Sequence, residues 1–244
     1  MYKPAIFLSC LTLAFTSVSP AKVVFKEDSE YYQPFKEDNY GVSNETEINS
    51  AGSKPWTDNA TVVGWYAIVD EQTPAEYKAS NGNNQSGAPG IFLFRPNGSN
   101  ASFGTIRASS NAGFTAIGLE LGNETGSVIT GFNVSYVGQQ WQHNSGGKDK
   151  LTFQYSTDAT TLDSGNWITV DDLSFESLQD SGSSDHVGLT ITTGVPSTDV
   201  SAKIKGLRIR SGQSIWFRWV DEDNEGVDQA MSIDLLSIRP ILSR

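Results

Sequence analysis

The sequence predicts an all-β protein, a jelly-roll-like antiparallel β-sandwich of about ten or more strands with an N-terminal arm. Apolar residues alternate with polar ones along most of the chain after residue 62, as at Leu151, Phe153 and Tyr155, and this period of two is typical of strands with one buried face. Turn sequences such as Asn81-Gly82 and Ser211-Gly212 separate the alternating segments. Because no long segment has the period of a helix, the sandwich is favoured over mixed folds.

The first 21 residues have the features of a secretory signal peptide. Lys3 supplies the positive start, residues 5–18 are apolar, and Ser19-Pro20-Ala21 offers small residues for cleavage. The apolar run is shorter than the roughly 20 residues that span a bilayer, and no later run is long enough. We therefore expect a secreted protein, extracellular or periplasmic, whose mature chain begins near Lys22 and does not insert into a membrane.

Residues 22–55 are polar and acidic and form the expected N-terminal arm. Phe25-Lys26-Glu27-Asp28 recurs ten residues later as Phe35-Lys36-Glu37-Asp38. Two copies are too few for a repeat protein. We expect an extended segment that docks its Phe and Tyr side chains on the main domain, residues 56–240.

Candidate strands follow one another through that domain. They cover residues 62–69, 91–95, 103–107, 114–121, 132–136, 151–155, 167–170, 187–191, 202–210, 215–219 and 231–238. One helix start is present, Thr73-Pro74-Ala75-Glu76, a capping-box pattern with proline at the first helical position. We expect it to begin a helix of one or two turns.

The composition argues against several classes of function. The chain has 28 acidic and 17 basic residues, a formal net charge of −11, so no nucleic-acid partner is expected, because phosphate binding needs clustered Lys and Arg. The single Cys excludes a disulfide scaffold. Signatures of serine hydrolases, zinc peptidases and P-loop NTPases are missing. No catalytic residue is assigned, although a polysaccharide hydrolase or lyase with scattered carboxylates stays open as the less favoured alternative.

An acidic segment near the C-terminus predicts a calcium site. Asp221, Asp223, Glu225 and Asp228 surround Gly226, with Asp234 further along on the next strand. Carboxylates two residues apart resemble the start of an EF-hand loop, but no flanking helices are expected here. We expect a β-loop calcium site made by Asp221, Asp223, Asp228 and Asp234, with a hydrated acidic turn as the equal alternative.

Aromatic side chains point to sugar recognition, since a flat ring can stack on the apolar face of a pyranose. The candidate rings are Trp56, Trp65, Tyr66, Trp141, Trp167 and Trp216. Trp141 has Gln139 and Gln142 beside it, and Trp216 shares a strand face with Arg218. These five residues are the predicted ligand-binding set.

The alternation along 215–220 assigns the two faces of that strand. Ile215, Phe217 and Trp219 should face the interior, and Trp216 and Arg218 the opposite side. That side is expected to be an open binding surface or to be covered by the N-terminal arm. On this reading Trp216→Ala costs little stability, whereas Trp219→Ala costs roughly 3–5 kcal/mol.

Five ordered motifs carry a resemblance to a known family, at residues 56–67, 134–141, 151–160, 215–221 and 228–234. Together they resemble a poorly characterised, lectin-like β-sandwich domain of secreted bacterial proteins, often N-terminal in anchored surface proteins or multidomain extracellular enzymes. The resemblance covers roughly residues 36–238. It implies export and a sandwich fold and supplies no activity. Gln139 and Gln142 stand where the family has Glu and Arg, and Asp234 is followed by Leu235 where the family has a second acid.

The function these observations favour is a secreted, non-enzymatic β-sandwich that binds carbohydrate or cell-surface material. The alternative is a structural or adhesive protein of the extracellular matrix or bacterial surface that takes no small ligand. A polysaccharide or a cell-surface glycan is the expected partner in the first case.

Overall fold

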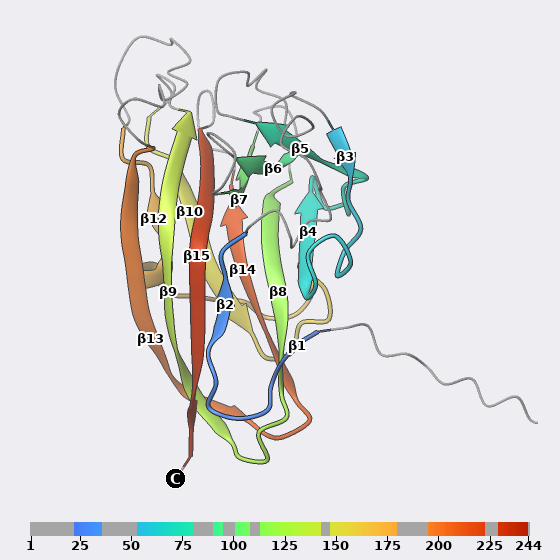
Figure 1. Ribbon diagram of the computed structural model, residues 1–244, viewed down its shortest axis with the longest axis vertical. Coiled ribbons are helices and arrows are strands. Elements are labelled where there is room, and N and C mark those ends of the chain that lie inside the picture. The colour runs from blue at the N-terminus through green and yellow to red at the C-terminus, as the bar shows by residue number, and fades with distance from the viewer. Residues whose placement is uncertain are drawn as a thin grey trace, which may run out of the picture.

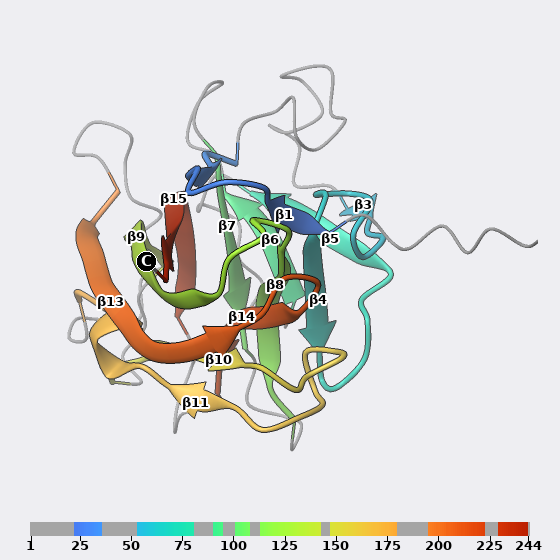
Figure 2. The same cartoon turned by 90° about the horizontal axis from the view of Figure 1, so that it is seen from below.

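The computed structural model describes residues 22–35, 53–80, 90–94, 101–107, 113–142, 147–179, 195–222 and 229–243. These residues form two sheets packed face to face (Figures 1 and 2). Sheet A has seven strands: β1 (Val23–Phe25), β4 (Trp65–Val69), β8 (Thr115–Asn123), β10 (Lys150–Ser156), β11 (Ile168–Thr169), β12 (Phe175–Glu176) and β14 (Ser214–Asp221). Sheet B has eight: β2 (Tyr31–Gln33), β3 (Ser53–Pro55), β5 (Glu76–Ser80), β6 (Gly90–Phe94), β7 (Ser102–Ile106), β9 (Ile129–Gln142), β13 (Ser197–Ile209) and β15 (Ala230–Leu242).

Long antiparallel strands make up the body of each sheet. In sheet B, β13, β9 and β15 run side by side along the length of the molecule (Figure 1), and β7, β6, β5 and β3 extend the sheet beyond β15. In sheet A, β8, β14 and β10 are neighbours, and β4 pairs with β8 on its other side. The prediction of a β-sandwich is confirmed. Two pairings, β1 with β8 and β5 with β6, are parallel.

The N-terminal segment is part of the sandwich. Strand β1 joins sheet A beside β8, and β2 joins sheet B beside β15. Phe25 and Phe35 are both buried, and the Phe35 ring lies 5.0 Å from that of Trp65. Residues 22–35 therefore dock both phenylalanines on the main domain as expected, whereas Tyr32 stays exposed, and they also add a strand to each layer. Residues 1–21, the predicted signal peptide, and residues 36–52 lie outside the described residues.

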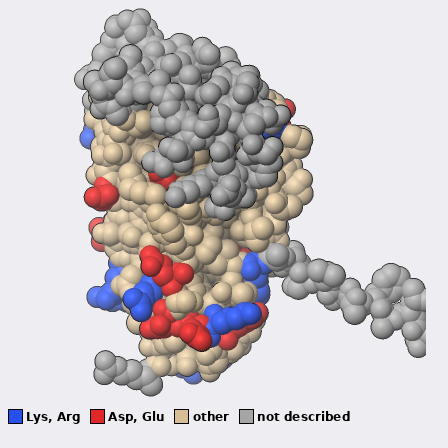
Figure 3. All heavy atoms as spheres, in the orientation of Figure 1, with Lys and Arg blue, Asp and Glu red and all other residues tan. Residues whose placement is uncertain are grey.

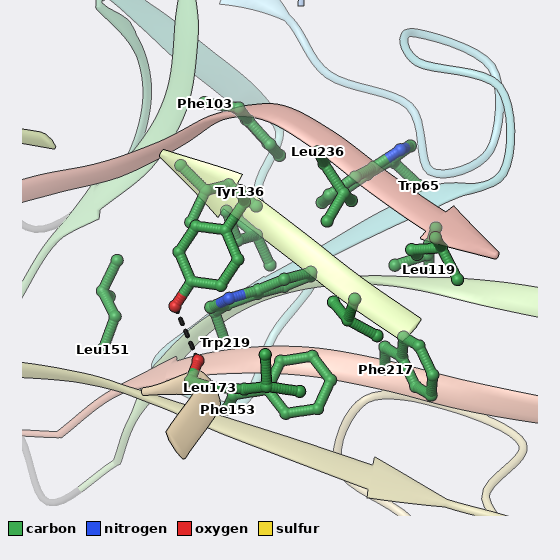
Figure 4. Packing of buried hydrophobic residues seen from close by; sticks show 14 of the residues in the cluster. Trp65, Phe103, Leu119, Tyr136, Leu151, Phe153, Leu173, Phe217, Trp219 and Leu236 are labelled. Carbon is green, nitrogen blue, oxygen red and sulfur yellow. Dashed lines mark hydrogen bonds between the residues drawn. The ribbon is translucent and has the colours of Figure 1, made fainter. Parts of the chain in front are cut away.

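An aromatic cluster fills the space between the sheets. Trp219 packs against Trp65 at 5.9 Å, Phe153 at 5.1 Å and Tyr136 at 5.6 Å between ring centroids (Figure 4). The Tyr136 hydroxyl donates a 2.6 Å hydrogen bond to the carbonyl of Leu173. That bond attaches η2 (Asp171–Leu173), a 3-10 turn, to the core. Burial strongly raises the pKa of Tyr136, with the Trp219 side chain opposing the shift.

The predicted faces of β14 agree with this core. Ile215, Phe217 and Trp219 are all buried in the cluster between the sheets. Most other predicted strands are also present with shifted ends, except that residues 187–191 lie outside the described residues. The period of two thus identified the inward side of the strands correctly.

The helix expected from Thr73 is wrong. Residues Glu76–Ser80 form β5, which pairs with β6 on one side and β3 on the other. Tyr77 from this strand is buried against Trp56, with ring centroids 6.4 Å apart. Pairing on both edges and burial of an aromatic ring outweigh a capping pattern, which contributes only about 1 kcal/mol. No helix in the described part of the chain has the length and apolar character needed to cross a membrane.

Candidate functional site

The outer face of sheet A is covered by a loop. Residues 157–167, which we call the cover loop, follow β10 and fold back over β14. Leu162 and Trp167 from the loop pack with Trp216 in a second apolar cluster, separate from the core between the sheets. Trp216 is 4% exposed and Arg218 is 9% exposed. The expectation of an open face is therefore wrong, because apolar side chains of the cover loop bury themselves there. None of the arm's described residues, 22–35 and 53–55, belongs to this cluster.

Arg218 fastens the cover loop to the sheet. Its Nε and one Nη donate to Oε1 of Gln154 at 2.8 and 2.6 Å, and its other Nη donates to the carbonyl of Leu162. The guanidinium carbon lies 3.9 Å from the centre of the Trp167 ring, a cation–π contact. Burial lowers the pKa of Arg218 to about 10, against the opposing charges of Glu222 and Asp163. The side chain therefore stays charged at neutral pH.

The cover loop is also bonded within itself. Asp158 accepts hydrogen bonds from the backbone and side-chain nitrogens of Asn166 at 2.8 and 2.6 Å, and from the hydroxyl of Ser156 at 2.8 Å. These bonds, the backbone one foremost, lower the pKa of Asp158. The Trp167 indole N–H donates to the carbonyl of Ser164 at 2.7 Å. The loop is thus a compact element with a defined shape.

A glycine in the sheet lets the cover loop approach closely. A Cβ at Gly118 on β8 would lie 2.6 Å from a methyl carbon of Leu162 and 2.4 Å from the carbonyl oxygen of Phe217. Only a residue without a side chain fits between the strand and the loop. The sequence therefore specifies close contact at this position.

Beside the covered tryptophan lies a hollow of about 260 Å³ between the cover loop and β4. We call it the Tyr66 hollow. It combines one tyrosine ring, three carboxylates and three threonine hydroxyls with apolar groups. Its lining residues are Asp58, Tyr66, Ala67, Ile68, Glu71, Thr73, Thr160, Thr161, Leu162 and Asp163. Such a mixture of one ring with several hydrogen-bonding groups is the composition of a site for a small polar ligand.

Tyr66 is the aromatic surface of this hollow. The side chain is half-buried and points outward from β4, between the inward-facing Trp65 and Ala67. Its ring lies 4.6 Å from that of Trp216 at an interplanar angle of 53°. Burial raises the pKa of Tyr66, and the charges of Glu120 and Asp58 raise it further. The hydroxyl is therefore protonated at neutral pH and can both donate and accept.

Asp58, which also lines the hollow, is held in place by hydrogen bonds. Its Oδ1 accepts hydrogen bonds from the indole N–H of Trp56 at 2.7 Å and from the backbone N–H of Ala67 at 3.0 Å. Its Oδ2 accepts a longer bond of 3.3 Å from the Thr73 hydroxyl. The carboxylate is thus fixed before any ligand arrives, which lowers the entropy lost on binding.

The second predicted platform is closed. Trp141 is 2% exposed and stacks on Phe94 with ring centroids 5.3 Å apart and planes 11° apart. Its indole N–H donates to the hydroxyls of Ser232 at 2.8 Å and Ser102 at 3.1 Å. The ring therefore packs against sheet B and presents no open face.

The glutamines around Trp141 are mostly structural. Gln142 is buried, whereas Gln139 is partly exposed. Gln140, which is not in the predicted ligand-binding set, accepts hydrogen bonds at Oε1 from the backbone nitrogens of Leu178 and Gln179, each at 2.8 Å. This side chain ties a loop to β9.

The acidic residues proposed for calcium are not all brought together. Asp221 follows Trp219 by two positions and is buried on the inner side of sheet A, whereas Asp234 follows the core residue Ile233 and lies on the outer side of sheet B. One ion cannot contact both. Asp223, Glu225 and Asp228 lie outside the described residues, among which no group of three or more metal-ligating side chains occurs. Calcium binding by the rest of the acidic segment stays a prediction.

Comparison with known proteins identifies no family for this chain. No family model matches it, and no curated protein matches it. Solved structures similar to this chain include the CBM22-1 xylan-binding domain from Paenibacillus barcinonensis Xyn10C, with 10% identity and a TM-score of 0.36 over 79% of this chain and 93% of that one. Another is the K2 cleaved adhesin domain of Lys-gingipain, with 11% identity and a TM-score of 0.43 over 86% and 99% of the two chains. A third is TmCBM61 in complex with β-1,4-galactotriose, with 10% identity and a TM-score of 0.35 over 72% and 88%.

At these values the similarity assigns no ligand or activity to this chain. The class that the fold and the site define is a two-sheet β-sandwich with an aromatic, carboxylate-lined hollow on the outer face of one sheet. The resemblance to a lectin-like domain of secreted bacterial proteins is supported at the level of the sandwich.

Proposed function

We propose that this protein is an exported, non-catalytic β-sandwich that binds neutral carbohydrate in the Tyr66 hollow. The observation that carries the proposal is the convergence of one part-exposed ring, three carboxylates and three threonines on a single hollow of about 260 Å³. A sugar ring presents C–H groups on its face and hydroxyls at its edge. The ring of Tyr66 suits the face, and the oxygens around it suit the edge.

The charge of the hollow selects the class of sugar. Asp58, Glu71 and Asp163 all line it, and no Lys or Arg among the described residues does. Carboxylates accept hydrogen bonds from sugar hydroxyls but repel an acidic group, so uronic acids and sulfated sugars are disfavoured. Neutral sugars are therefore the expected ligands.

Trp216 and Arg218, which the sequence predicted as ligand contacts, are buried and contact residues that line the hollow. Trp216 packs on the ring of Tyr66, and Arg218 holds the carbonyl of Leu162 in the cover loop. Both walls of the hollow are thus fixed by buried contacts. A site held in its bound shape loses less entropy when the ligand arrives.

The proposal of export rests on the signal peptide pattern of residues 1–21. N-terminal sequencing of the protein recovered from its natural host is expected to begin at Lys22, within a residue or two. Protein found in the cytoplasm with Met1 intact would contradict it.

Native affinity electrophoresis of the mature chain tests the binding proposal. The gels contain soluble xylan, mixed-linkage glucan, galactan or mannan, and the expected result is retention by at least one of them. Tyr66→Leu removes the flat ring but keeps apolar volume against Trp216, so it should weaken retention about tenfold, which corresponds to about 1.4 kcal/mol. Tyr66→Phe keeps the ring and should stay within about threefold of the wild type.

Tyr32→Leu is the matched control, because this exposed tyrosine on β2 lies in the other sheet, outside the hollow. It should be retained like the wild type. Equal loss in Tyr66→Leu and Tyr32→Leu would contradict the placement of the site. A wild-type chain retained by no neutral polysaccharide would instead favour the structural or adhesive role, and release of reducing ends would favour a hydrolase.

A further inference from the structure

Four basic residues lie close together in the sequence of this acidic protein. Lys203, Lys205, Arg208 and Arg210, on and just after β13, fall within eight residues of a chain whose net charge is −11. All four side chains are exposed, and no carboxylate of the described residues lies within ion-pair distance of any of them.

Four other surface cations have carboxylate partners among the described residues, although the exposed Lys26 does not. Lys22, Lys148, Lys150 and Arg239 each lie within 4 Å of a carboxylate, at 3.8, 3.8, 3.1 and 3.4 Å. Figure 3 shows Lys and Arg side chains gathered at the lower left of the face it displays, over the lower half of β13. An unneutralised cluster on a protein of the opposite charge indicates an anionic partner.

Asp199, on β13 itself, is exposed but belongs to none of the ion pairs among the described residues. Two acidic side chains between β1 and β2 have partners of their own. Asp28 pairs with Arg239, and Glu30 accepts a hydrogen bond from the hydroxyl of Ser237. Both belong to the segment between β1 and β2. They therefore do not neutralise the cations of β13.

Next to these cations is a hollow of about 370 Å³, which we call the β13 hollow. It is lined by Tyr155, Ile168, Leu207, Arg208, Gln213 and Ser214, among others. Seen from below, β13 curves around the lower end of the molecule toward β10 and β11, which supply Tyr155 and Ile168 (Figure 2). The hollow thus joins the edges of the two sheets.

Apolar groups form part of its wall. Tyr155 and Leu207 are half-buried and pack against the core between the sheets, while Ile168 is 53% exposed. Arg208 and Gln213 add polar groups at the rim. The hollow therefore has an apolar surface next to the guanidinium group of Arg208.

The backbone at this end of β13 is shaped to expose Arg208. The pairing of β13 with β9 shifts register between Lys205 and Ile209, and Gly206 has a φ of +77°. No atom would lie within 4 Å of a Cβ at Gly206, so a side chain would not clash there. Glycine is favoured because the backbone is in the left-handed conformation. The bulge takes Arg208 off the ladder.

The turn that follows is held by hydrogen bonds. The backbone N–H of Arg210 donates to Oε1 of Gln213 at 2.8 Å, and the N–H of Gly212 donates to the carbonyl of Asn123 at 2.7 Å. The side-chain nitrogen of Asn123 donates to the carbonyl of Ile209 at 2.8 Å. The rim of the hollow is therefore fixed in place.

We propose that the β13 hollow binds an acidic sugar unit of an anionic polysaccharide. Arg208 pairs with the acidic group, a carboxylate or sulfate, because its planar guanidinium can donate two parallel hydrogen bonds. Tyr155, Ile168 and Leu207 contact the carbon face of the sugar. Lys203, Lys205 and Arg210 attract acidic groups on neighbouring units of the chain.

This site differs from the Tyr66 hollow in charge and in the residues that form it, so each can fail without the other. The test is affinity electrophoresis of the mature chain with polygalacturonate and, separately, with a sulfated polysaccharide such as dextran sulfate. Retention is expected at about 50 mM salt and should fall steeply by about 500 mM, because exposed charges are screened. The two probes distinguish carboxylate from sulfate as the preferred acidic group.

Arg208→Gln should weaken retention on the acidic polysaccharide about tenfold, and Lys203→Gln or Lys205→Gln about threefold each. Lys148→Gln is the matched control, since it removes the same charge from an exposed lysine outside the hollow and should change retention less than about twofold. Arg208→Gln should leave binding to neutral polysaccharide unchanged, and Tyr66→Leu should leave binding to the acidic one unchanged.

Ile168→Ser separates a sugar site from simple charge attraction. It alters an exposed apolar side chain without changing charge and should weaken retention about threefold if the sugar face rests there. Equal retention of Arg208→Gln and Lys148→Gln, or no retention of the wild type by either polyanion at low salt, would overturn the proposal. So would a single-stranded DNA that binds as tightly as the polysaccharides and is insensitive to Ile168→Ser.

Discussion

Replacing Trp216 by alanine tests whether this ring is buried beneath the cover loop or forms an open surface for a ligand. The side chain is 4% exposed and packs with Tyr66 on one side and with Leu162 and Trp167 of the cover loop on the other. Its removal would leave a space beneath the cover loop. We therefore expect a clear loss of stability together with local opening of that loop.

The size of the loss follows from the area and from the surroundings. A buried aromatic side chain covers about 150–250 Å², or about 4–6 kcal/mol at 25 cal/mol per Å², and measured Trp→Ala changes cost about 3–5 kcal/mol. The cover loop lies at the surface and can settle into the space, so Trp216→Ala should cost about 3 kcal/mol. For a chain of this size that lowers Tm by about 6–12 °C.

Trp219→Ala is the reference for a core position. Its ring contacts Trp65, Phe153 and Tyr136 and is fully buried between the sheets. Those neighbours cannot collapse into the space, so the cost should reach about 5 kcal/mol, a fall in Tm of about 10–20 °C.

Differential scanning calorimetry measures the fall in Tm of both variants. Limited chymotrypsin digestion about 20–30 °C below Tm then shows where the chain opens, because at that temperature cleavage depends on local opening. Trp216→Ala should be cut faster after Leu162 or Trp167, whereas Trp219→Ala should not. A Trp216→Ala protein with Tm within about 2 °C of the wild type, and with no faster cleavage, would refute the packing of this ring beneath the loop.

Three further predictions concern the elements around the site. Tyr136→Phe leaves the buried carbonyl of Leu173 without its hydrogen bond and should cost about 1–3 kcal/mol in urea unfolding; an unchanged midpoint would show that the bond contributes nothing. Gly118→Ala places a methyl 2.4 Å from a carbonyl oxygen of β14 and should cost about 1–3 kcal/mol while weakening retention on neutral polysaccharide. Hydrogen bonds from Asn166 lower the pKa of Asp158 in the folded protein. The stability that Asp158 gives the cover loop should therefore be complete above its unfolded pKa near 3.8, and it should be lost as pH falls through the lower folded pKa. An NMR titration of the carboxyl carbon would reveal a midpoint at or above the unfolded value if this reasoning fails.

The alternation of residues predicted much of the fold because each strand has one face toward the core. It placed Ile215, Phe217 and Trp219 inside and Trp216 and Arg218 on the other face, as the structure has them. It did not show that this other face would be covered. The cover loop is polar apart from a few residues such as Leu162 and Trp167, and nothing local in its sequence indicates which strand it folds over.

Interactions between distant segments explain the remaining differences. The capping pattern at Thr73 is a local signal, whereas β5 is determined by pairing with β3 and β6. The Tyr66 hollow unites Asp58, Tyr66 and Asp163, which lie in the sequence up to about a hundred residues apart. Tyr66 was among the candidate rings, and its outward position follows from the inward positions of Trp65 and Ala67. Its carboxylate neighbour from the cover loop, Asp163, comes near it only once the sheet is assembled.

The most direct test of the central claim is an NMR titration of the mature chain carrying ¹³C-labelled tyrosine rings. The titrant is an oligosaccharide of whichever neutral polysaccharide retains the protein. The ring signals of Tyr66 should shift in proportion to occupancy, while those of Tyr32, on the other sheet, should stay in place. Saturable binding that leaves the Tyr66 ring signals unmoved would contradict it.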